Sequence, residues 1–198
     1  MTTPDSTWWL LDYGNVVSTS QPDADRDELV RLSGARAEGF WERYWAYRHE
    51  YDLGVDDESY WSRVCDRPLV TGTDALDAIV AADNASWSHH RPEVLDLLAA
   101  QRASGRRLAM LSNAPHALAR HHETDGAVDV FERRFYSAPL GLAKPDAAIY
   151  THVLDELGAA PGDVTFVDDR ADNVEAASAL GFHAVLFQSS EDLLALAR

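Results

Sequence analysis

Three carboxylates in this chain follow apolar runs that have the character of buried strands. Asp12 comes directly after WWLL, and Asp168 and Asp169 end the run VTFVDD. A carboxylate such as Asp12 can attack phosphorus to form an aspartyl-phosphate, or an activated carbon to form an ester. Together the three side chains offer the hard oxygen ligands that Mg²⁺ takes in proteins. One set of residues can therefore supply both a nucleophile and a metal site.

A second group of residues has the chemistry to bind and neutralise a phosphate. Ser112 and Asn113 follow the run RLAM, and Lys144 stands in LAKPD just before a helical pattern. The first two can donate hydrogen bonds to non-bridging phosphate oxygens, and the lysine can neutralise charge on the nucleophile and the transferring group. Phosphoryl transfer depends mainly on positioning and charge stabilisation, so these residues supply the parts it needs.

Each of these features also has a purely structural explanation when it is taken alone. An Asp at a strand end commonly forms a turn, and Ser or Asn after a strand commonly caps the next helix. Lys144 by itself fits a solvated surface, and Asp169 or Asp172 can cap a helix that begins near residue 171. The catalytic interpretation is favoured because the four features occur in order, each beside a strand or a helix start.

Short apolar segments alternate with helical patterns over most of the chain. The predicted strands are residues 8–11, 107–112, 133–138, 164–169 and 183–187, and the clearest helical patterns are 91–105, 145–158 and 170–181. Apolar strands alternating with helices predict an α/β fold, a Rossmann-like open parallel sheet flanked by helices. Ligands bind at the carboxyl edge of such a sheet, where we expect the polar residues above to converge.

Residues 19–87 interrupt this alternation with a helical, aromatic-rich stretch that contains no convincing strand. The segment FWERYWAYRHEY places several aromatic side chains at helical spacing. We interpret 19–87 as a helical insertion, so residues 1–18 and 88–198 form the α/β core domain. Its tryptophans are expected mostly to pack, since aromatic residues at helical spacing usually do. Three residues are candidates to face a substrate: Tyr44, Arg48 and His49.

The charge and composition of the chain argue against a nucleic-acid-binding or membrane-spanning protein. The chain has 33 acidic and 17 basic residues and a formal net charge of −16, which argues against nucleic-acid binding. The same charge repels an anionic substrate, so a divalent cation and a placed lysine are required locally. No apolar run approaches the roughly 20 residues that span a bilayer, and the first residues lack signal-peptide features. We expect a cytoplasmic protein without a membrane or nucleic-acid partner.

The combined motifs resemble those of the haloacid dehalogenase-like hydrolase superfamily across essentially the whole length. The four matching segments are LLDYGNVV, MLSNA, LAKPD and VDDRADN. More narrowly, GLAKPDAAIY and FVDDRADNVEAA are similar to the branch of bacterial phosphatases that resemble alpha-D-glucose-1-phosphate phosphatase. The resemblance implies a Mg²⁺-dependent phosphatase that hydrolyses a small phosphorylated metabolite, such as a sugar phosphate, through an aspartyl-phosphate. It also implies that 19–87 is a C1-type cap over the site.

Carried over to this sequence, the resemblance makes Asp12 the nucleophile and Lys144 its catalytic partner. The implied phosphate-binding residues are Ser112, Asn113 and Lys144. The implied Mg²⁺ ligands are three carboxylates and one backbone carbonyl, from Asp12, Gly14, Asp168 and Asp169. Asn173 would support the metal-binding loop.

Gly14 departs from the pattern of many phosphatases in the superfamily, which carry a second Asp there as general acid and base. A leaving group of low pKa lessens that need, or Asn15 or a cap residue positions the water instead. Two other functions remain open. A metal-free 2-haloacid dehalogenase would share Asp12 and Lys144 but has no use for Asp168 and Asp169. A non-enzymatic or weakly active relative would act through a protein partner.

Overall fold

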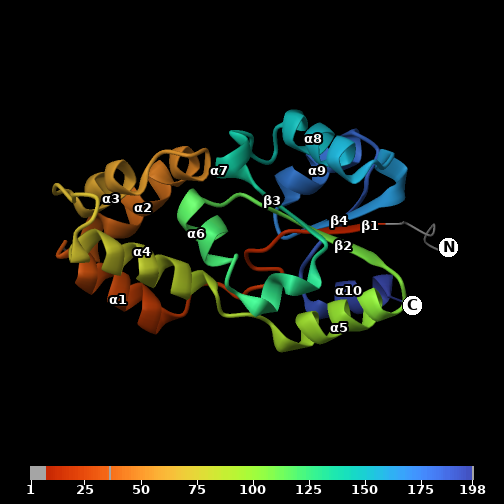
Figure 1. Cartoon of the computed structure of the whole chain (residues 1–198), viewed down its shortest axis with the longest axis horizontal. Coiled ribbons are helices and arrows are strands. Elements are labelled where there is room, and N and C mark those ends of the chain that lie inside the picture. Colours follow the sequence, from red (N-terminus) through yellow and green to blue (C-terminus); the bar gives the residue numbers. More distant parts are fainter. Residues whose placement is uncertain (1–7, 36, 198) are drawn as a thin grey trace.

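The computed structural model describes residues 8–35 and 37–197 and contains a five-stranded, all-parallel sheet in the order β3-β2-β1-β4-β5 (Figure 1). Its strands are β1 (Trp8–Leu11), β2 (Arg107–Ser112), β3 (Arg133–Tyr136), β4 (Val164–Asp168) and β5 (His183–Leu186). In register, Leu11 of the central strand pairs with Met110 and Val167 on its two neighbours. The carboxyl ends of the three central strands therefore lie side by side, as expected for an α/β fold of the Rossmann type.

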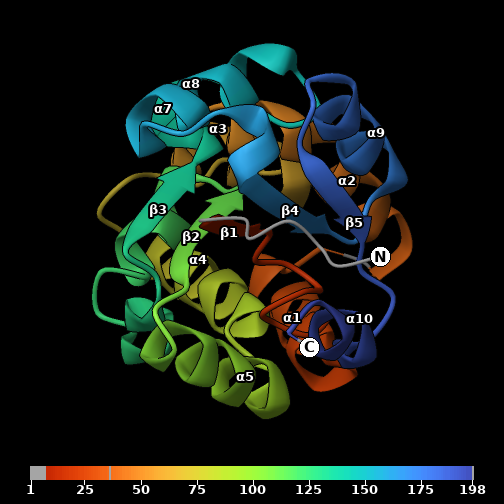
Figure 2. The ribbon, with the colours of Figure 1, turned by 90° about the vertical axis from the view of Figure 1, so that its right-hand side faces the viewer.

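Helices cover both faces of the sheet (Figure 2). They are α5 (Pro92–Ala103), α6 (His116–His121), α7 (Ser137–Leu140), α8 (Ala147–Leu157), α9 (Ala171–Ala179) and α10 (Ser190–Leu196), with short 3₁₀ turns at Gly126–Val130 and Pro161–Asp163. Trp9 and Leu11 face a cluster with α5 and α10, whereas Trp8 and Leu10 face a cluster with α8 and α9. Side chains alternate along a strand, so WWLL is buried on both faces and has to be apolar throughout.

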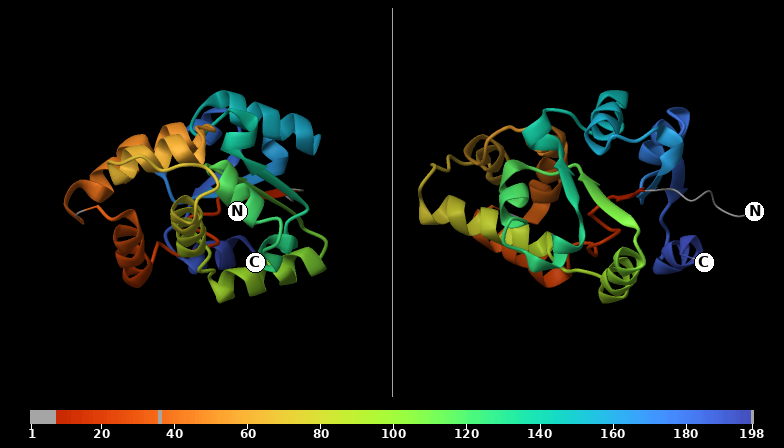
Figure 3. Two further views of the ribbon diagram at one scale, coloured as in Figure 1. Left: turned by 60° about the vertical axis from the view of Figure 1, so that its left-hand side comes forward. Right: turned by 45° about the vertical axis from the view of Figure 1, so that its right-hand side comes forward.

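Four helices between β1 and α5 form a separate layer beyond the carboxyl edge of the sheet (Figure 3). They are α1 (Asp23–Ser33), α2 (Ala37–Asp52), α3 (Asp57–Cys65) and α4 (Asp74–Trp87). The backbone of α2 is non-helical at Glu38 and Gly39. These helices bury a hydrophobic cluster of their own, centred on Tyr44, Tyr60 and Trp61. We call α1–α4 the cap; the separate cluster supports the domain division at 19 and 87, which stays an interpretation.

Three predicted strands end earlier than the sequence suggested, and β4 and β5 do so by a single residue. The expected strand 133–138 stops at Tyr136, and α7 begins at Ser137. Pro139 lacks the N–H that a strand ladder needs, and the Ser137 hydroxyl is held by its bond to the backbone N–H of Ala114 (2.8 Å). Within residues 8–35 and 37–197, no helix combines the length and apolar character that crossing a bilayer requires.

Candidate active site

Asp12 stands one residue beyond β1 at the carboxyl edge of the sheet. Its backbone N–H donates to the carbonyl of Val167 (2.8 Å), which extends the sheet pairing to this residue. Its side-chain Oδ1 accepts a hydrogen bond from the backbone N–H of Tyr13 (2.7 Å). The chain then turns sharply, with Asn15 in the left-handed region at φ 59°. The carboxylate is thus fixed at the strand tip, as the sequence position predicts.

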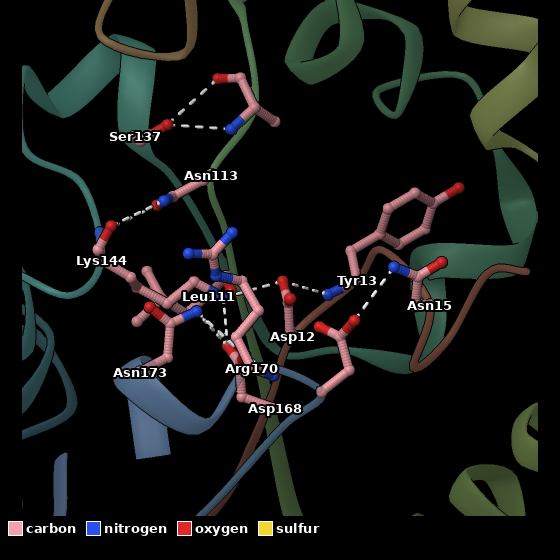
Figure 4. Close-up of polar contacts among 12 residues, drawn as sticks. Asp12, Tyr13, Asn15, Leu111, Asn113, Ser137, Lys144, Asp168, Arg170 and Asn173 are labelled. Atoms are coloured by element: carbon pink, nitrogen blue, oxygen red, sulfur yellow. Dashed lines mark hydrogen bonds and ion pairs between the residues drawn. The ribbon is translucent and has the colours of Figure 1, made fainter. Parts of the chain in front are cut away.

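Lys144 reaches into this edge and joins two of the three predicted carboxylates (Figure 4). Its Nζ lies 2.8 Å from Asp12 Oδ1 and 2.6 Å from Asp168 Oδ2. It also donates to the carbonyl of Leu111 (2.8 Å), so all three ammonium hydrogens have acceptors. Burial alone would lower the pKa of Lys144, but Asp12 and Asp168 outweigh it and raise that pKa, so the ammonium stays charged.

Asp168 is the last residue of β4 and Asp169 follows it before α9, and the two are held by different partners. Asp168 is fully buried and accepts from the side-chain amide of Asn173 (2.9 and 3.0 Å) and from the backbone N–H of Arg170 (2.9 Å). Asp169 accepts from the side chain of Asn15 (3.0 Å). Asn15 and Asn173 therefore each hold one of these two carboxylates.

The donor set suits a divalent cation. Asp12, Asp168 and Asp169 each present a carboxylate oxygen, and these atoms lie within 4.8 Å of one another. Among the described residues, the single positive charge of Lys144 is the one that pairs with Asp12 and Asp168, so the ionised cluster is left strongly negative. Burial raises the pKa of Asp12 to about 7, against the opposing effect of Lys144, and burial also raises the pKa of Asp169. Hard oxygen donors that repel each other are what Mg²⁺ would stabilise.

The predicted phosphate-binding dipeptide lies at the same edge but uses its side chains differently. Ser112 and Asn113 both line the pocket at the end of β2. The amide of Asn113 donates to the carbonyl of Lys144 (2.8 Å) and accepts from its backbone N–H (2.9 Å). These two bonds hold the backbone of Lys144 and use one of the two amide hydrogens of Asn113. The side chain therefore positions the lysine, and the expected donation to phosphate stays a prediction.

A pocket of about 460 Å³ opens between this edge and the cap. From the core it is lined by residues that include Asp12, Gly14, Ser112, Lys144 and Asp169. From the cap it is lined by Trp45, Arg48, His49, Asp52 and Trp87. The pocket thus has one wall from the sheet and one from the helices.

Of the three cap residues predicted to face a substrate, two line the pocket and one is not among its lining residues. Arg48 and His49 line the pocket, whereas Tyr44 is fully buried in the cap and does not. The expectation for Tyr44 is corrected because its hydroxyl donates to Asp83 Oδ1 (2.7 Å), which turns the ring inward. Trp45, expected to pack, is instead 53% exposed and lines the pocket.

Two cap residues at the pocket, Asp52 and Trp87, were not singled out by sequence reasoning. Trp87 ends α4, and a β-carbon at Gly14 would lie 3.6 Å from its indole ring. The ring therefore borders the space into which a longer side chain at position 14 would extend. Neither residue belongs to a motif, so only the long-range packing of cap on core reveals them.

Arg48 is the centre of a buried polar cluster in the cap wall of the pocket. Its Nε donates to Asp52 Oδ1 (2.8 Å), and its Nη1 donates to the Tyr44 hydroxyl. The same Nη1 lies 3.5 Å from Asp83 Oδ2. Burial raises the pKa of Asp52 to about 6, in spite of the lowering effect of Arg48. Burial likewise raises the pKa of Asp83.

Comparison with known proteins places this geometry in a family. A family model described as haloacid dehalogenase-like hydrolase matches residues 11–181. The chain is 29% identical over 190 residues to Phosphatase MT3486 of Mycobacterium tuberculosis, covering 91% of this chain and 87% of that protein. It is 32% identical over 114 residues to enolase-phosphatase E1 of Acidiphilium cryptum, covering 56% of this chain and only 49% of that relative.

A solved structure shares the fold over nearly the whole chain. It is a mutant of the HAD family enzyme BT-2542 of Bacteroides thetaiotaomicron in complex with magnesium and inorganic phosphate. The TM-score is 0.76 at 22% identity, covering 96% of this chain and 98% of that one. With the family match over most of its length, this chain belongs to the haloacid dehalogenase-like hydrolases.

Proposed function

We propose that this protein is a Mg²⁺-dependent phosphatase that hydrolyses a small phosphate ester through an aspartyl-phosphate on Asp12. The observation that carries the proposal is the cluster at the carboxyl edge of the sheet, where the Lys144 ammonium contacts Asp12 and Asp168. With the half-buried Asp169, these carboxylates lie close enough together to bind one cation. Relatives named as phosphatases support the same reaction class. An acidic protein needs such local positive charge to hold an anionic ester.

Each residue has a defined part in this reaction. Asp12 attacks phosphorus, and Lys144 holds the nucleophile and neutralises charge on the transferring group. Ser112 and the backbone N–H of Asn113 bind the non-bridging oxygens. Mg²⁺, held by the three carboxylates and the carbonyl of Gly14, would supply Lewis-acid stabilisation of the phosphoryl charge. Asn15 and Asn173 fix the orientation of Asp169 and Asp168.

The alternatives use fewer of these features. A metal-free dehalogenase would need Asp12 and Lys144 but gains nothing from Asp169, whose charge would repel a carboxylate substrate. A partner-binding relative without activity has no need for a buried lysine between two carboxylates, an arrangement that is costly to desolvate. The complete polar set therefore favours catalysis.

The cap wall favours a substrate whose organic part is uncharged. Arg48 is the buried cation of that wall, and it is already paired with Asp52 and lies near Asp83. A second phosphate or carboxylate on the substrate would be repelled by Asp52 and Asp83. Trp45 and Trp87 offer aromatic surface beside hydrogen-bonding groups, a combination that fits a sugar phosphate.

Phosphate release from a panel of phosphate esters, with 2-haloacids included, tests the proposal. We expect turnover of esters with neutral organic groups in Mg²⁺ and its loss in EDTA. Halide release without metal would establish the dehalogenase instead. No turnover of any ester or haloacid would favour the non-enzymatic relative.

A further inference from the structure

Gly14, two residues after Asp12, has no side chain that could donate a proton. A residue of the cap borders the space beside it. The Trp87 ring borders the space beyond Gly14. Apart from Asp12 and Asp169, the carboxylate that lines the pocket in the described part of the chain is Asp52. We propose that Asp52, at the end of α2, is the general acid and base that the core lacks. The inference rests on the proposed phosphatase function.

Asp52 is held toward the phosphate-binding edge by contacts that cross from cap to core. The Ser137 hydroxyl donates to the backbone carbonyl of Asp52 and accepts from the backbone N–H of Ala114. Ala114 directly follows Ser112 and Asn113. At Gly54, φ is 106° and a β-carbon would lie 3.3 Å from the carbonyl of Ala138, so this end of α2 packs closely on α7. Two hydrogen bonds thus link the phosphate loop to Asp52.

The carboxyl group has one oxygen fixed and one free to act. Oδ1 accepts from Arg48 Nε, whereas Oδ2 accepts no hydrogen bond from the residues the structure describes. His49 also lines the pocket, but its side chain is exposed and makes no described hydrogen bond. A proton donor must be held in place to be effective, which favours Asp52 over His49.

The chemistry balances over two steps. In the first, Asp12 attacks phosphorus, the bond from phosphorus to the leaving oxygen breaks, and the proton of the Asp52 carboxyl group passes to that oxygen. In the second, water attacks the aspartyl-phosphate, its proton passes to the Asp52 carboxylate, and the bond to Asp12 breaks. Alcohol and phosphate leave, and both aspartates return to their starting states. Acids whose pKa lies near the working pH are the most effective at this, and that of Asp52 is raised to about 6.

Leaving-group dependence distinguishes this role from a structural one. Glycerol 2-phosphate has a basic leaving oxygen that needs a proton, whereas p-nitrophenyl phosphate does not. For Asp52→Asn we expect kcat/KM for glycerol 2-phosphate to fall about 10²–10³-fold, and that for p-nitrophenyl phosphate by less than about tenfold. Asp83→Asn is the matched control, because Asp83 contacts the same Arg48 network but does not line the pocket. It should change both substrates by the same factor.

A measurement on the unaltered protein covers the case in which Asp52→Asn fails to fold. The ratio of kcat/KM for glycerol 2-phosphate to that for p-nitrophenyl phosphate cancels the enzyme groups that both reactions share. With each value corrected for the substrate's own second phosphate pKa, which lies at about 6, the ratio should fall as the pH rises through about 6. Arg48, Asp83 and His49 act electrostatically on this carboxyl group and influence the midpoint, and His116 lies beside the neighbouring Gly54. A ratio that is flat with pH, or equal losses in Asp52→Asn, overturns the inference alone. No turnover of either ester by the wild-type protein would overturn the proposed function as well.

Discussion

The two walls of the pocket hold buried charge in opposite arrangements. On the core wall a single cation, Lys144, lies between two carboxylates, and a third carboxylate stands close by. On the cap wall the cation Arg48 also lies between two carboxylates and donates to a tyrosine hydroxyl, and among the described residues no third carboxylate contacts it. The core cluster is thus open to a further cation, whereas the two carboxylates of the cap cluster are paired with Arg48 and only Asp52 presents an oxygen to the pocket without a described hydrogen bond. The first arrangement suits catalysis and the second suits shaping and proton transfer.

The largest expected effect comes from the core wall. Asp12→Asn should lower kcat by at least about 10⁴-fold, because no other described residue takes the place of the nucleophile. The melting temperature should not fall, since Asn removes a like charge while Lys144 keeps its contact with Asp168. Steady-state kinetics and thermal unfolding measure both. Residual turnover close to wild type would mean that the core wall does not carry the chemistry.

Removing the central cation of each wall tests the comparison directly. Lys144→Met and Arg48→Met each leave buried carboxylates without a partner, which should lower the free energy of unfolding by about 3–5 kcal/mol. Mg²⁺ should restore much of the loss in the lysine variant, because the cation binds the carboxylates left exposed to each other. In the arginine variant, Mg²⁺ should raise the free energy of unfolding no more than it does in the wild-type protein. Equal recovery in both, measured by denaturant unfolding with and without Mg²⁺, would contradict the difference between the walls.

The cap wall also predicts a pH dependence of stability. An aspartate in the unfolded chain titrates near 3.9, whereas the pKa of Asp52 is raised to about 6. Between these values the folded protein holds a proton that the unfolded chain has lost, so this contribution to stability is lost as the pH rises from about 4 to 6. Asp52→Asn should lack it, and its stability relative to wild type should improve by roughly 2–3 kcal/mol over that range. An unchanged difference across the range would show that Asp52 titrates normally.

The sequence predicted most of the residues that meet at the core wall, but it did not predict how the cap wall is arranged. Parallel strands put their carboxyl ends at one edge, so Asp12, Ser112 and Asp168 could be brought together from strand positions alone. The role of the Asn113 side chain could not, because its acceptor and donor belong to the backbone of Lys144, some thirty residues along the chain. A local sequence pattern predicts where a strand ends. It does not predict which side-chain amide will form hydrogen bonds with the backbone of a distant loop.

In the cap, the helices were anticipated but their rotation was not. Tyr44 and Trp45 are neighbours on α2, yet the first turns into the cap cluster and the second into the pocket. Aromatic residues surround this helix, so hydropathy gives it no preferred face. The choice is made by Asp83 and Tyr60 on other helices, which fix Tyr44 through its hydroxyl and its backbone carbonyl.

The smallest expected effect separates recognition from folding within the cap. Trp45 is half exposed at the pocket, so Trp45→Ala should cost less than about 1 kcal/mol of stability while raising KM several-fold for esters with bulky organic groups. Inhibition by inorganic phosphate should stay the same, because the proposed phosphate-binding residues all belong to the core wall. Trp41→Ala is the control on the same helix, since Trp41 packs against the cap cluster away from the pocket, and KM should not respond to it. If both substitutions raise KM equally, the effect arises from a loosened cap rather than from contact with the substrate.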